Sequence, residues 1–351
     1  MSDEFSALTS ALRDWLAQKI DGASDLKLIG AFEPAQGFSS QTVLFTAKWQ
    51  ESGEERTWDL VARLQRDVSC PLLADVFHQY RVMSVASAVP GVHVPAPVFA
   101  EEDPGPLKAP FFIMEQASGR VPSDFPSYHA EGWIAELPLE RRTQLWWNGI
   151  EAMERLHRID WSEFTSLTDV QSTPPDARFY IQKFIVPWLE WAANGRRFPV
   201  IEDAITELLK VAPPVTRSGL VWNDARMGNV MFGKNEQVSA LFDFEVASLG
   251  PAEIDLAWWL YADDIFSENF GVTRLPGIPQ GTEAIRGFEA RYGYAMPHFT
   301  YYLALAALKH AVISIRDYSN DKRSGEAEGI TPFPIKRLQQ YLGEYRNISG
   351  S

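Results

Sequence analysis

The chain has 351 residues, of which 46% are hydrophobic and 22% are charged, as in water-soluble globular proteins of two domains or of one domain with two lobes. Its 46 acidic residues outnumber its 32 basic residues and give a formal net charge of −14, which argues against nucleic acid and anionic membrane surfaces as partners. The single cysteine, Cys70, excludes an intrachain disulfide and a cluster of thiolate metal ligands.

The sequence pattern predicts neither a signal peptide nor a membrane-spanning helix. The N-terminal residues show no basic segment followed by an apolar one, so we expect no signal peptide and a cytoplasmic protein. The longest apolar run, residues 301–315, is shorter than a membrane span and contains Lys309 and His310. We therefore expect this run to form a buried helix.

The first third of the chain predicts one helix followed by short strands. Residues 5–20 carry Leu or Ile at every fourth position, which is typical of an amphipathic helix. Runs rich in β-branched and aromatic residues predict strands at 26–32, 42–50 and 58–65, with a tight turn at 51–55. Further elements are a helix within 72–89, a strand within 93–110 and a strand at 111–115.

The remainder of the chain is mostly helical in pattern. Two short strands are expected around a loop within residues 220–245. Helices are predicted at 138–159, 177–193, 200–212, 253–262, 281–292, 299–318 and 333–347. The sequence therefore predicts an α+β protein with a small β-rich N-terminal lobe (1–113), a hinge (114–119) and a larger helical C-terminal lobe (120–351).

One segment has the spacing of a phosphoryl-transfer site. In LVWNDARMGN (220–229), Asp224 precedes Asn229 by five residues, and Asp243 follows an apolar run in LFDFE (241–245). Carboxylate and amide oxygens suit Mg²⁺, an Asp at a loop start can face an acceptor hydroxyl, and Arg226 could reach the transferred phosphate. The spacing alone is equally compatible with turn-forming residues and a helix cap.

The same segment resembles the catalytic region of the aminoglycoside phosphotransferase family, which includes choline, homoserine and fructosamine kinases. Closest are the phosphotransferases related to the kinase domain fused to some acyl-CoA dehydrogenases. Their pattern HGDxRxGN, followed by LDWE and GxxxxDLAW, is matched here by NDARMGN (223–229), LFDFE (241–245) and LGPAEIDLAWW (249–259). The resemblance extends from about residue 28 to about residue 318 and implies a bilobal protein-kinase-like fold.

The resemblance implies an enzyme that moves the γ-phosphoryl group of ATP or GTP to a hydroxyl group of a small molecule with Mg²⁺. It assigns catalytic roles to Asp224, as the base, and to Arg226, beside the transferred phosphate. It assigns the magnesium ligands to Asn229 and Asp243. It implies neither nucleic acid nor membrane as a partner.

The resemblance also assigns nucleotide-binding residues in the N-terminal half. Arg63 in VARL (61–64) matches the basic residue that holds the nucleotide phosphates, and a guanidinium can bridge two phosphate oxygens. The segment GFSS (37–40) matches the phosphate loop, with backbone N–H groups and hydroxyls as donors. The implied nucleotide-binding residues are Gly37, Ser39, Ser40, Arg63 and, through the hinge backbone, Glu115 and Ala117.

Three residues depart from the family pattern. Gln79 stands where a Glu usually pairs with the basic residue, and Asp75, one turn earlier, could take that role. Trp222 replaces a His that organises the catalytic loop, and an indole can still brace the loop through its N–H. Asn223 replaces a Gly and must then adopt a backbone conformation open to Asn. These departures leave a second hypothesis, a catalytically silent nucleotide-binding protein.

The acceptor is left open by the sequence. Asp263, Asp264 and Glu268 could attract a cationic sugar or amine. Tryptophans could instead suit a more apolar acceptor, although core packing is the simpler interpretation for most of them; they are Trp146, Trp147, Trp188, Trp191, Trp258 and Trp259. Aminoglycosides, other sugars or amino alcohols, macrolides and hydroxyacyl thioesters all fit these observations. His157 is expected to be structural.

Overall fold

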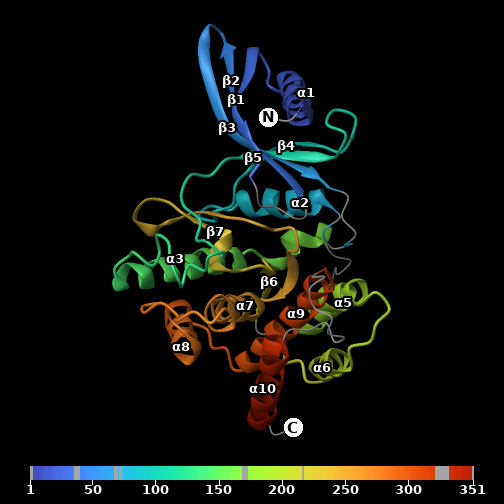
Figure 1. Cartoon of the computed structure of the whole chain (residues 1–351), viewed down its shortest axis with the longest axis vertical. Coiled ribbons are helices and arrows are strands. Elements are labelled where there is room, and N and C mark those ends of the chain that lie inside the picture. The colour runs from blue at the N-terminus through green and yellow to red at the C-terminus, as the bar shows by residue number, and fades with distance from the viewer. Residues whose placement is uncertain are drawn as a thin grey trace. The chain divides into compact units, whose positions relative to one another are not determined.

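The structure is a computed structural model that describes residues 3–34, 40–66, 70, 73, 75–167, 173–215, 217–320 and 332–349. These residues divide into two compact units (Figure 1). The smaller unit is drawn from residues 1–90 and 94–118, and the larger unit from residues 91–93 and 119–351.

Within the described residues, the smaller unit contains a five-stranded antiparallel sheet with the strand order β1-β2-β3-β5-β4 (Figure 1). The strands are β1 (Ser24–Phe32), β2 (Ser40–Glu51), β3 (Glu54–Gln65), β4 (Pro97–Glu101) and β5 (Phe111–Glu115). Each forms where β-branched and aromatic residues predicted it. The register pairs Arg63 of β3 with Thr42 on one side and Phe112 on the other, which places Arg63 on the central strand.

A tight turn joins β2 to β3, as the sequence predicted. Glu51 pairs with Glu54, and the two residues between them, Ser52 and Gly53, have φ angles of 53° and 83°. Positive φ at both positions is the type I′ geometry that matches the right-handed twist of paired strands.

The core of the smaller unit lies between the sheet and α1 (Asp3–Lys19). Alternate residues of β2, among them Val43 and Phe45, are buried in one cluster with Leu12 and Trp15 of α1. This period of two is what a strand with one buried face requires. The Trp15 ring meets the buried strand β5 edge-on, so the helix predicted from leucine spacing is fixed on the sheet by aromatic packing.

The larger unit is built mainly of helices. Its helices are α3 (Leu139–His157), α4 (Ala177–Tyr180), α5 (Val186–Ala193), α6 (Pro199–Lys210), α7 (Glu253–Asp264), α8 (Gly281–Tyr292), α9 (Phe299–Asn320) and α10 (Pro332–Ser349). Helix α7 is buried along almost its whole length, and α9 lies against α5, α7 and α10 (Figure 1). Among the described residues, no helix combines the length and the apolar character needed to cross a bilayer.

Two small antiparallel ribbons accompany these helices. Strand β6 (Ser218–Val221) pairs with β9 (Ser248–Pro251), and β7 (Val230–Phe232) pairs with β8 (Val238–Leu241). The sequence predicted two strands in this region with Asp243 on the second. The structure instead ends β8 at Leu241 and gives Asp243 a φ angle of 62°, so this aspartate lies on a turn after the strand.

Two helical segments of the larger unit are wound more loosely than an α-helix. The helix predicted at 177–193 contains a π-helical segment, η3 (Ile181–Ile185), between α4 and α5. A second, η6 (Ile265–Asn269), follows α7 directly. Such segments shift the side chains that follow and are frequent beside functional sites. Side-chain periodicity does not reveal them.

Candidate active site

The catalytic loop predicted at 222–229 lies between β6 and β7. Strand β6 ends at Val221, and a 3-10 turn, η4 (Met227–Asn229), leads into β7. The N–H of Asn229 donates to the carbonyl of Arg226 at 3.0 Å, which closes the turn. The carbonyl of Asn229 in turn accepts from the N–H of Phe242 at 2.9 Å. The second bond places Asn229 next to Phe242, the residue that precedes Asp243, so the two parts of the predicted motif adjoin each other.

A buried carboxylate supports the start of the loop. Asp255, at the N-terminal end of α7, is fully buried and accepts hydrogen bonds from the backbone N–H groups of Trp222 at 2.6 Å and Asn223 at 2.7 Å. His157 Nε2 lies 2.8 Å from the same carboxylate. His157 is buried and its partner holds the loop backbone, as expected of a structural residue.

Trp222 and Asn223 both brace the loop through their side chains. The indole N–H of Trp222 donates to the carbonyl of Phe242 at 2.6 Å, as expected of a ring with a donor in this position. Asn223 has a φ angle of 73°, a conformation that Asn tolerates better than most residues. Its amide donates to the carbonyl of Val246 at 2.7 Å, and its Oδ1 accepts from Tyr180 at 2.7 Å.

Asp224 is the focus of the loop. Its Oδ1 accepts from the indole N–H of Trp258 at 3.1 Å, and its Oδ2 accepts from Arg226 Nε at 3.0 Å and from Asn229 Nδ2 at 2.7 Å. Burial alone would raise the pKa of Asp224, but the charges of Arg226 and Lys309 outweigh it and hold the pKa below its usual value. Asp224 is thus an ionised, acceptor-only group at neutral pH.

Arg226 lies between two carboxylates. Besides Asp224, it bonds to Asp124, whose side chain comes from the segment that follows the predicted hinge. Gly228 leaves room for this pair, because a Cβ atom there would stand 2.4 Å from both the Arg226 Nη1 and an Asp124 carboxylate oxygen. Burial raises the pKa of Asp124, and the nearby guanidinium offsets only part of that rise.

A buried lysine lies beneath the loop. Lys309 of α9 is 4% exposed, and its ammonium donates to the carbonyl of Asn223 and, at 3.0 Å, to the Asn223 Oδ1. The ammonium also lies 3.8 Å from the centre of the Trp258 ring, within cation–π range. Burial lowers the pKa of Lys309 to about 8, and the charges of Asp224 and Asp255 oppose that fall.

The two residues assigned to magnesium supply hard oxygen atoms. Asn229 donates its Nδ2 to Asp224, which leaves its Oδ1 as the atom available to a cation. The turn that carries Asp243 is linked to Asn229 by the bond between Phe242 N–H and the Asn229 carbonyl. An amide oxygen and a carboxylate match the ligands that Mg²⁺ takes in phosphoryl-transfer sites, so the donor set fits the ion.

In the smaller unit, Arg63 lies on the central strand, and its Nη1 donates to Thr42 Oγ1 at 2.9 Å. Gln79 is buried on α2 (Val76–Ser87). Asp75, the alternative partner considered for Arg63, instead caps α2 by accepting from the Phe77 N–H at 2.8 Å and forms an ion pair with Arg81 at 2.5 Å. Its carboxylate is therefore already engaged within its own helix.

The other nucleotide-binding candidates are only partly described. Ser40 begins β2, and its buried hydroxyl has no hydrogen-bond partner among the described residues. Gly37 and Ser39 lie outside the described residues. The N–H of Glu115, at the end of β5, donates to a carbonyl of the same unit at 3.0 Å. The base of a bound nucleotide would therefore have to bond to the Glu115 carbonyl or to the backbone of Ala117.

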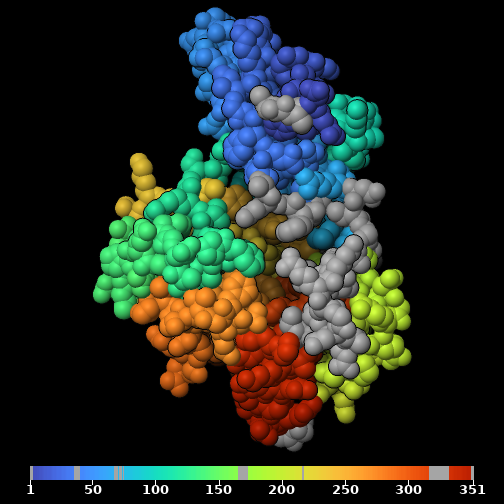
Figure 2. All heavy atoms as spheres, in the orientation of Figure 1, coloured from blue at the N-terminus to red at the C-terminus, as the bar shows by residue number. Residues whose placement is uncertain are grey.

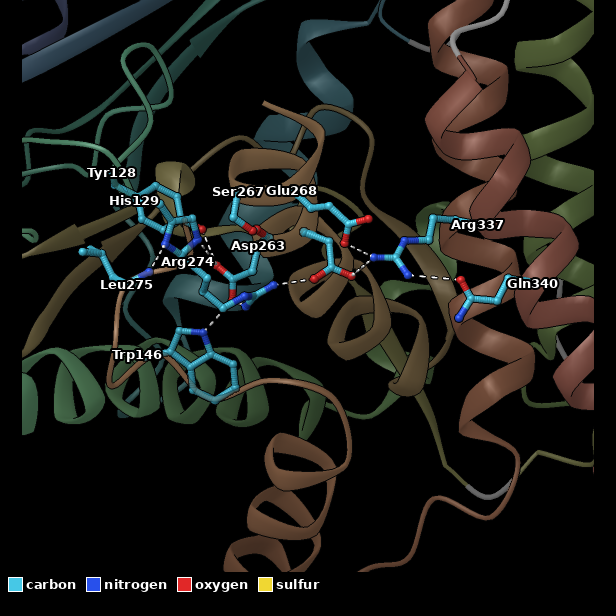
Figure 3. Close-up of polar contacts among 11 residues, drawn as sticks. Tyr128, His129, Trp146, Asp263, Ser267, Glu268, Arg274, Leu275, Arg337 and Gln340 are labelled. Atoms are coloured by element: carbon cyan, nitrogen blue, oxygen red, sulfur yellow. Dashed lines mark hydrogen bonds and ion pairs between the residues drawn. The ribbon is translucent and has the colours of Figure 1, made fainter. Parts of the chain in front are cut away.

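The acidic residues proposed to attract a cationic acceptor, Asp263, Asp264 and Glu268, have internal partners (Figure 3). Asp263 is 1% exposed and accepts hydrogen bonds from the Tyr128 hydroxyl and, at 2.9 Å, from the Trp146 indole. Burial would raise the pKa of Asp263, but hydrogen bonds and nearby positive charge keep the pKa below its usual value. Asp263 therefore holds the core together and is closed to an acceptor.

Asp264 and Glu268 are neutralised by arginines. Arg274 bonds to Asp264, and its Nη1 lies 3.5 Å from Asp263 Oδ2. Arg337 of α10 bonds to Glu268 and lies 3.8 Å from Asp264 (Figure 3). The hypothesis that these carboxylates recognise a cation is thus not supported by their surroundings.

Sequence reasoning did not identify four residues that contact the loop: Asp124, Asp255, Trp258 and Lys309. Asp255 and Trp258 belong to the quoted motif IDLAWW, but their bonds to the loop were not anticipated. Lys309 left a signal, because it is a charged residue inside an otherwise apolar helix pattern. Core packing, expected for most of the tryptophans, is confirmed for Trp146, Trp147, Trp258 and Trp259, which are all buried.

Sequence comparisons relate this chain to known proteins. A model of the phosphotransferase enzyme family matches residues 33–297. Acyl-CoA dehydrogenase family member 10 of Mus musculus is 28% identical over 280 residues, which cover 76% of this chain and 25% of that protein. Family member 11 of Mus musculus is 22% identical over 330 residues, which cover 88% of this chain and 41% of that protein. The chain therefore spans less than half the length of these curated relatives.

Solved structures show the same fold. A Ralstonia eutropha protein assigned as an aminoglycoside phosphotransferase superposes with a TM-score of 0.66 at 22% identity, over 97% of this chain and 98% of that one. Ethanolamine kinase of Plasmodium vivax gives 0.58 at 12%, over 97% and 89%. Aminoglycoside phosphotransferase APH(4)-Ia, solved with ADP and hygromycin B, gives 0.55 at 16%, over 95% and 98%.

The predicted α+β, kinase-like fold and the family resemblance are both confirmed. The family match covers three quarters of the chain and includes the whole segment from Trp222 to Asp255 that forms the site. The chain belongs to the phosphotransferase enzyme family.

Proposed function

We propose that the chain is a small-molecule kinase that transfers the γ-phosphoryl group of ATP or GTP to a hydroxyl group of its acceptor. The observation that supports this proposal most directly is the surroundings of Asp224. An ionised carboxylate held by Trp258, Arg226 and Asn229 is fixed in one orientation and keeps lone-pair capacity on Oδ1. Such a group can align a hydroxyl and accept its proton.

The proposed chemical step is a transfer of the γ-phosphoryl group from the nucleotide to the acceptor oxygen. The acceptor oxygen forms a bond to the γ-phosphorus, the bond from that phosphorus to the β–γ bridging oxygen breaks, and the nucleoside diphosphate leaves. The acceptor proton passes to Asp224. Because the pKa of Asp224 is held low, proton transfer belongs late in the step, and the main contribution of Asp224 is to orient the acceptor.

Arg226 supplies positive charge beside the base. Its planar guanidinium can donate to two phosphate oxygens at once, which a lysine cannot do with the same geometry. In the structure it donates to Asp224 and Asp124. These two bonds fix the guanidinium beside the Asp224 carboxylate, and we propose that it contacts the transferred phosphoryl group there.

Asn229 and Asp243 would hold Mg²⁺ through the Asn229 Oδ1 and the Asp243 carboxylate. When bound, the ion neutralises charge on the nucleotide phosphates. The residues of this chain contribute position: the Phe242 N–H bond to the Asn229 carbonyl keeps the two ligands on adjoining turns.

We propose that the nucleotide binds through Arg63, Ser40 and the backbone of Glu115 and Ala117, together with Gly37 and Ser39. The buried hydroxyl of Ser40, which has no described partner, is consistent with a phosphate contact. APH(4)-Ia has been solved with ADP and with AMP-PNP, which supports an adenine nucleotide as the co-substrate. The similar structures include kinases of hygromycin B, ethanolamine and macrolides, which supports a small-molecule acceptor and neither nucleic acid nor membrane.

The test compares Asp224→Asn, Asp243→Asn and, as a matched control, Asp203→Asn on the exposed face of α6. Two readouts separate binding from turnover: a magnesium-dependent thermal shift with ATP or GTP, and nucleotide consumption over a panel of hydroxyl acceptors. We expect Asp224→Asn to bind nucleotide and to lose at least about 100-fold in turnover. Turnover at the control rate in both site variants would contradict the proposal. Nucleotide binding without turnover of any acceptor by the wild type would support the silent alternative.

A further inference from the structure

Three aromatic rings form one cluster in the larger unit. The ring centre of Phe125 lies 6.5 Å from that of Phe266 and 5.4 Å from that of Phe270, and Phe266 and Phe270 lie 5.6 Å apart. Phe266 is buried, but Phe270 is 37% exposed and Phe125 is 73% exposed. Single exposed apolar residues need no explanation, whereas two on one packed cluster form a surface that water solvates poorly.

This aromatic cluster begins one residue from the proposed active site. Phe125 follows Asp124, and Asp124 bonds to Arg226, which bonds to Asp224. Two successive ion pairs therefore connect Asp124, the residue that precedes Phe125 in the chain, to Asp224.

The cluster lies on two segments that are far apart in the sequence and are joined by hydrogen bonds and ring contacts. Ser127 donates to the carbonyl of Phe266 at 2.5 Å, and the Tyr128 ring lies 5.9 Å from that of Phe266. Tyr128 also bonds to the buried Asp263, to which the Trp146 indole donates (Figure 3). On the face shown in Figure 2, the segment around 120–137 (green) borders the segment around 263–297 (orange). The exposed rings are thus preorganised, which lowers the cost of binding.

The charge around the cluster does not favour a cation. The acidic residues nearby in the sequence, Asp264 and Glu268, are bonded to Arg274 and Arg337. An acceptor with several ammonium groups would meet carboxylates whose charge is already balanced by arginines, whereas an apolar group would replace water on Phe125 and Phe270.

We propose that the aromatic cluster binds the apolar part of the acceptor, so that the substrate class is a hydroxyl compound with an aliphatic chain or an apolar ring. This inference rests on the proposed function, because it places the acceptor hydroxyl at Asp224. Phe125 and Phe270 are then specificity-determining residues, and Phe266 supports them from below.

The experiment uses the full chain with ATP and Mg²⁺ and compares butane-1,2-diol, hexane-1,2-diol and decane-1,2-diol, with kanamycin as a polycationic acceptor. We expect kcat/KM to rise by about two- to fourfold for each methylene that covers the rings. Phe125→Ser and Phe270→Ser should each reduce, by about tenfold, the ratio of kcat/KM for decane-1,2-diol to that for butane-1,2-diol. Val200→Ser, at a comparably exposed position on α6, should leave it unchanged.

Equal kcat/KM across the diols, or a preference for kanamycin that Phe125→Ser does not alter, would overturn the inference. If none of these compounds is phosphorylated, the proposed function fails for this acceptor class, and calorimetric binding of decane-1,2-diol decides the inference separately. Binding that weakens about tenfold in Phe125→Ser but not in Val200→Ser supports the cluster as a site, and binding that is absent or unchanged in Phe125→Ser overturns it.

Discussion

Lys309 offers the sharpest test of how the predicted catalytic loop is held, because it contacts the loop from helix α9, 86 residues from Asn223 in the sequence. Its ammonium donates to the carbonyl and side chain of Asn223 and lies over the ring of Trp258, whose N–H donates to Asp224. Replacing Lys309 by Met keeps the approximate length and apolar stem of the side chain and removes the charge and all three donors.

The expected loss of stability follows from what the ammonium leaves behind. A buried acceptor without its donor costs about 1–3 kcal/mol, and the cation–π contact with Trp258 contributes about 0.5–2 kcal/mol. Asn223 also occupies a left-handed conformation, with φ of 73°, that its bonds help to hold. Met also relieves the desolvation that lowers the pKa of the buried ammonium, which offsets part of these losses. We therefore expect Lys309→Met to lower the free energy of unfolding of the larger unit by roughly 1–2 kcal/mol in urea titrations.

The effect on activity separates positioning from simple packing. If Lys309 orients Asp224 through Asn223 and Trp258, kcat should fall by about 10- to 100-fold while KM for ATP changes little. Trp258→Phe, which removes the N–H donor to Asp224 and reduces the aromatic ring under Lys309, should reproduce the fall in kcat. The double variant should lose less than the product of the two single losses, because both act on Asp224.

Lys336→Met on the exposed face of α10 is the matched control for the charge change. Lys309→Arg keeps the charge and should recover part of the lost kcat. A Lys309→Met protein that is destabilised yet retains kcat within threefold of the wild type would refute the reasoning, since Lys309 would then be a stabilising core residue without influence on the base.

Three further predictions concern the same region. Gly228→Ala should separate Arg226 from Asp124, because its Cβ would stand 2.4 Å from both, and we expect a loss in kcat of about tenfold, with a smaller effect in an Asp124→Asn background. Asp255→Asn should lower stability by roughly 3 kcal/mol and broaden the NMR signals of the loop, since it weakens the bonds that hold two buried backbone N–H groups. Burial and a neighbouring ammonium lower the pKa of His310 to about 4, so the unfolded chain binds more protons between pH 4 and 6.5 and stability falls as the pH falls through that window. The wild type should lose up to about 3 kcal/mol more than His310→Gln between pH 7 and pH 4 in urea titrations, and parallel curves would contradict this.

Local signals in the sequence account for most of the fold. The strands of the smaller unit and the turn at Ser52 and Gly53 follow from residue types that favour them over a few positions. The helices of the larger unit follow from apolar periodicity. Residues 127–137 form turns, in which Ser127 and Tyr128 bond to residues of a segment distant in the sequence.

The residues of the candidate site likewise fall into two groups: those whose partners are close in the sequence and those whose partners are distant. Asp224, Arg226 and Asn229 lie within six residues of one another, so their spacing was visible in the sequence and their bonds form within a single loop. Asp124 is 102 residues from Arg226, and Lys309 is 86 residues from Asn223. No spacing rule reports pairs that only the tertiary structure brings together.

Two of the departures from the family pattern, Trp222 and Asn223, are explained by the hydrogen bonds that their side chains form. The loop needs donors to the turn that carries Asp243, and it receives them from the Trp222 indole, which bonds to Phe242, and from the Asn223 amide, which bonds to Val246. Both substitutions therefore keep a hydrogen bond between the loop and that turn. What they change is the volume behind the loop: Trp222 is fully buried and stacks with an aromatic ring of the same turn, at a centroid distance of 5.8 Å. A brace of that size fixes the loop by packing as well as by hydrogen bonding, which argues for a rigid, working site.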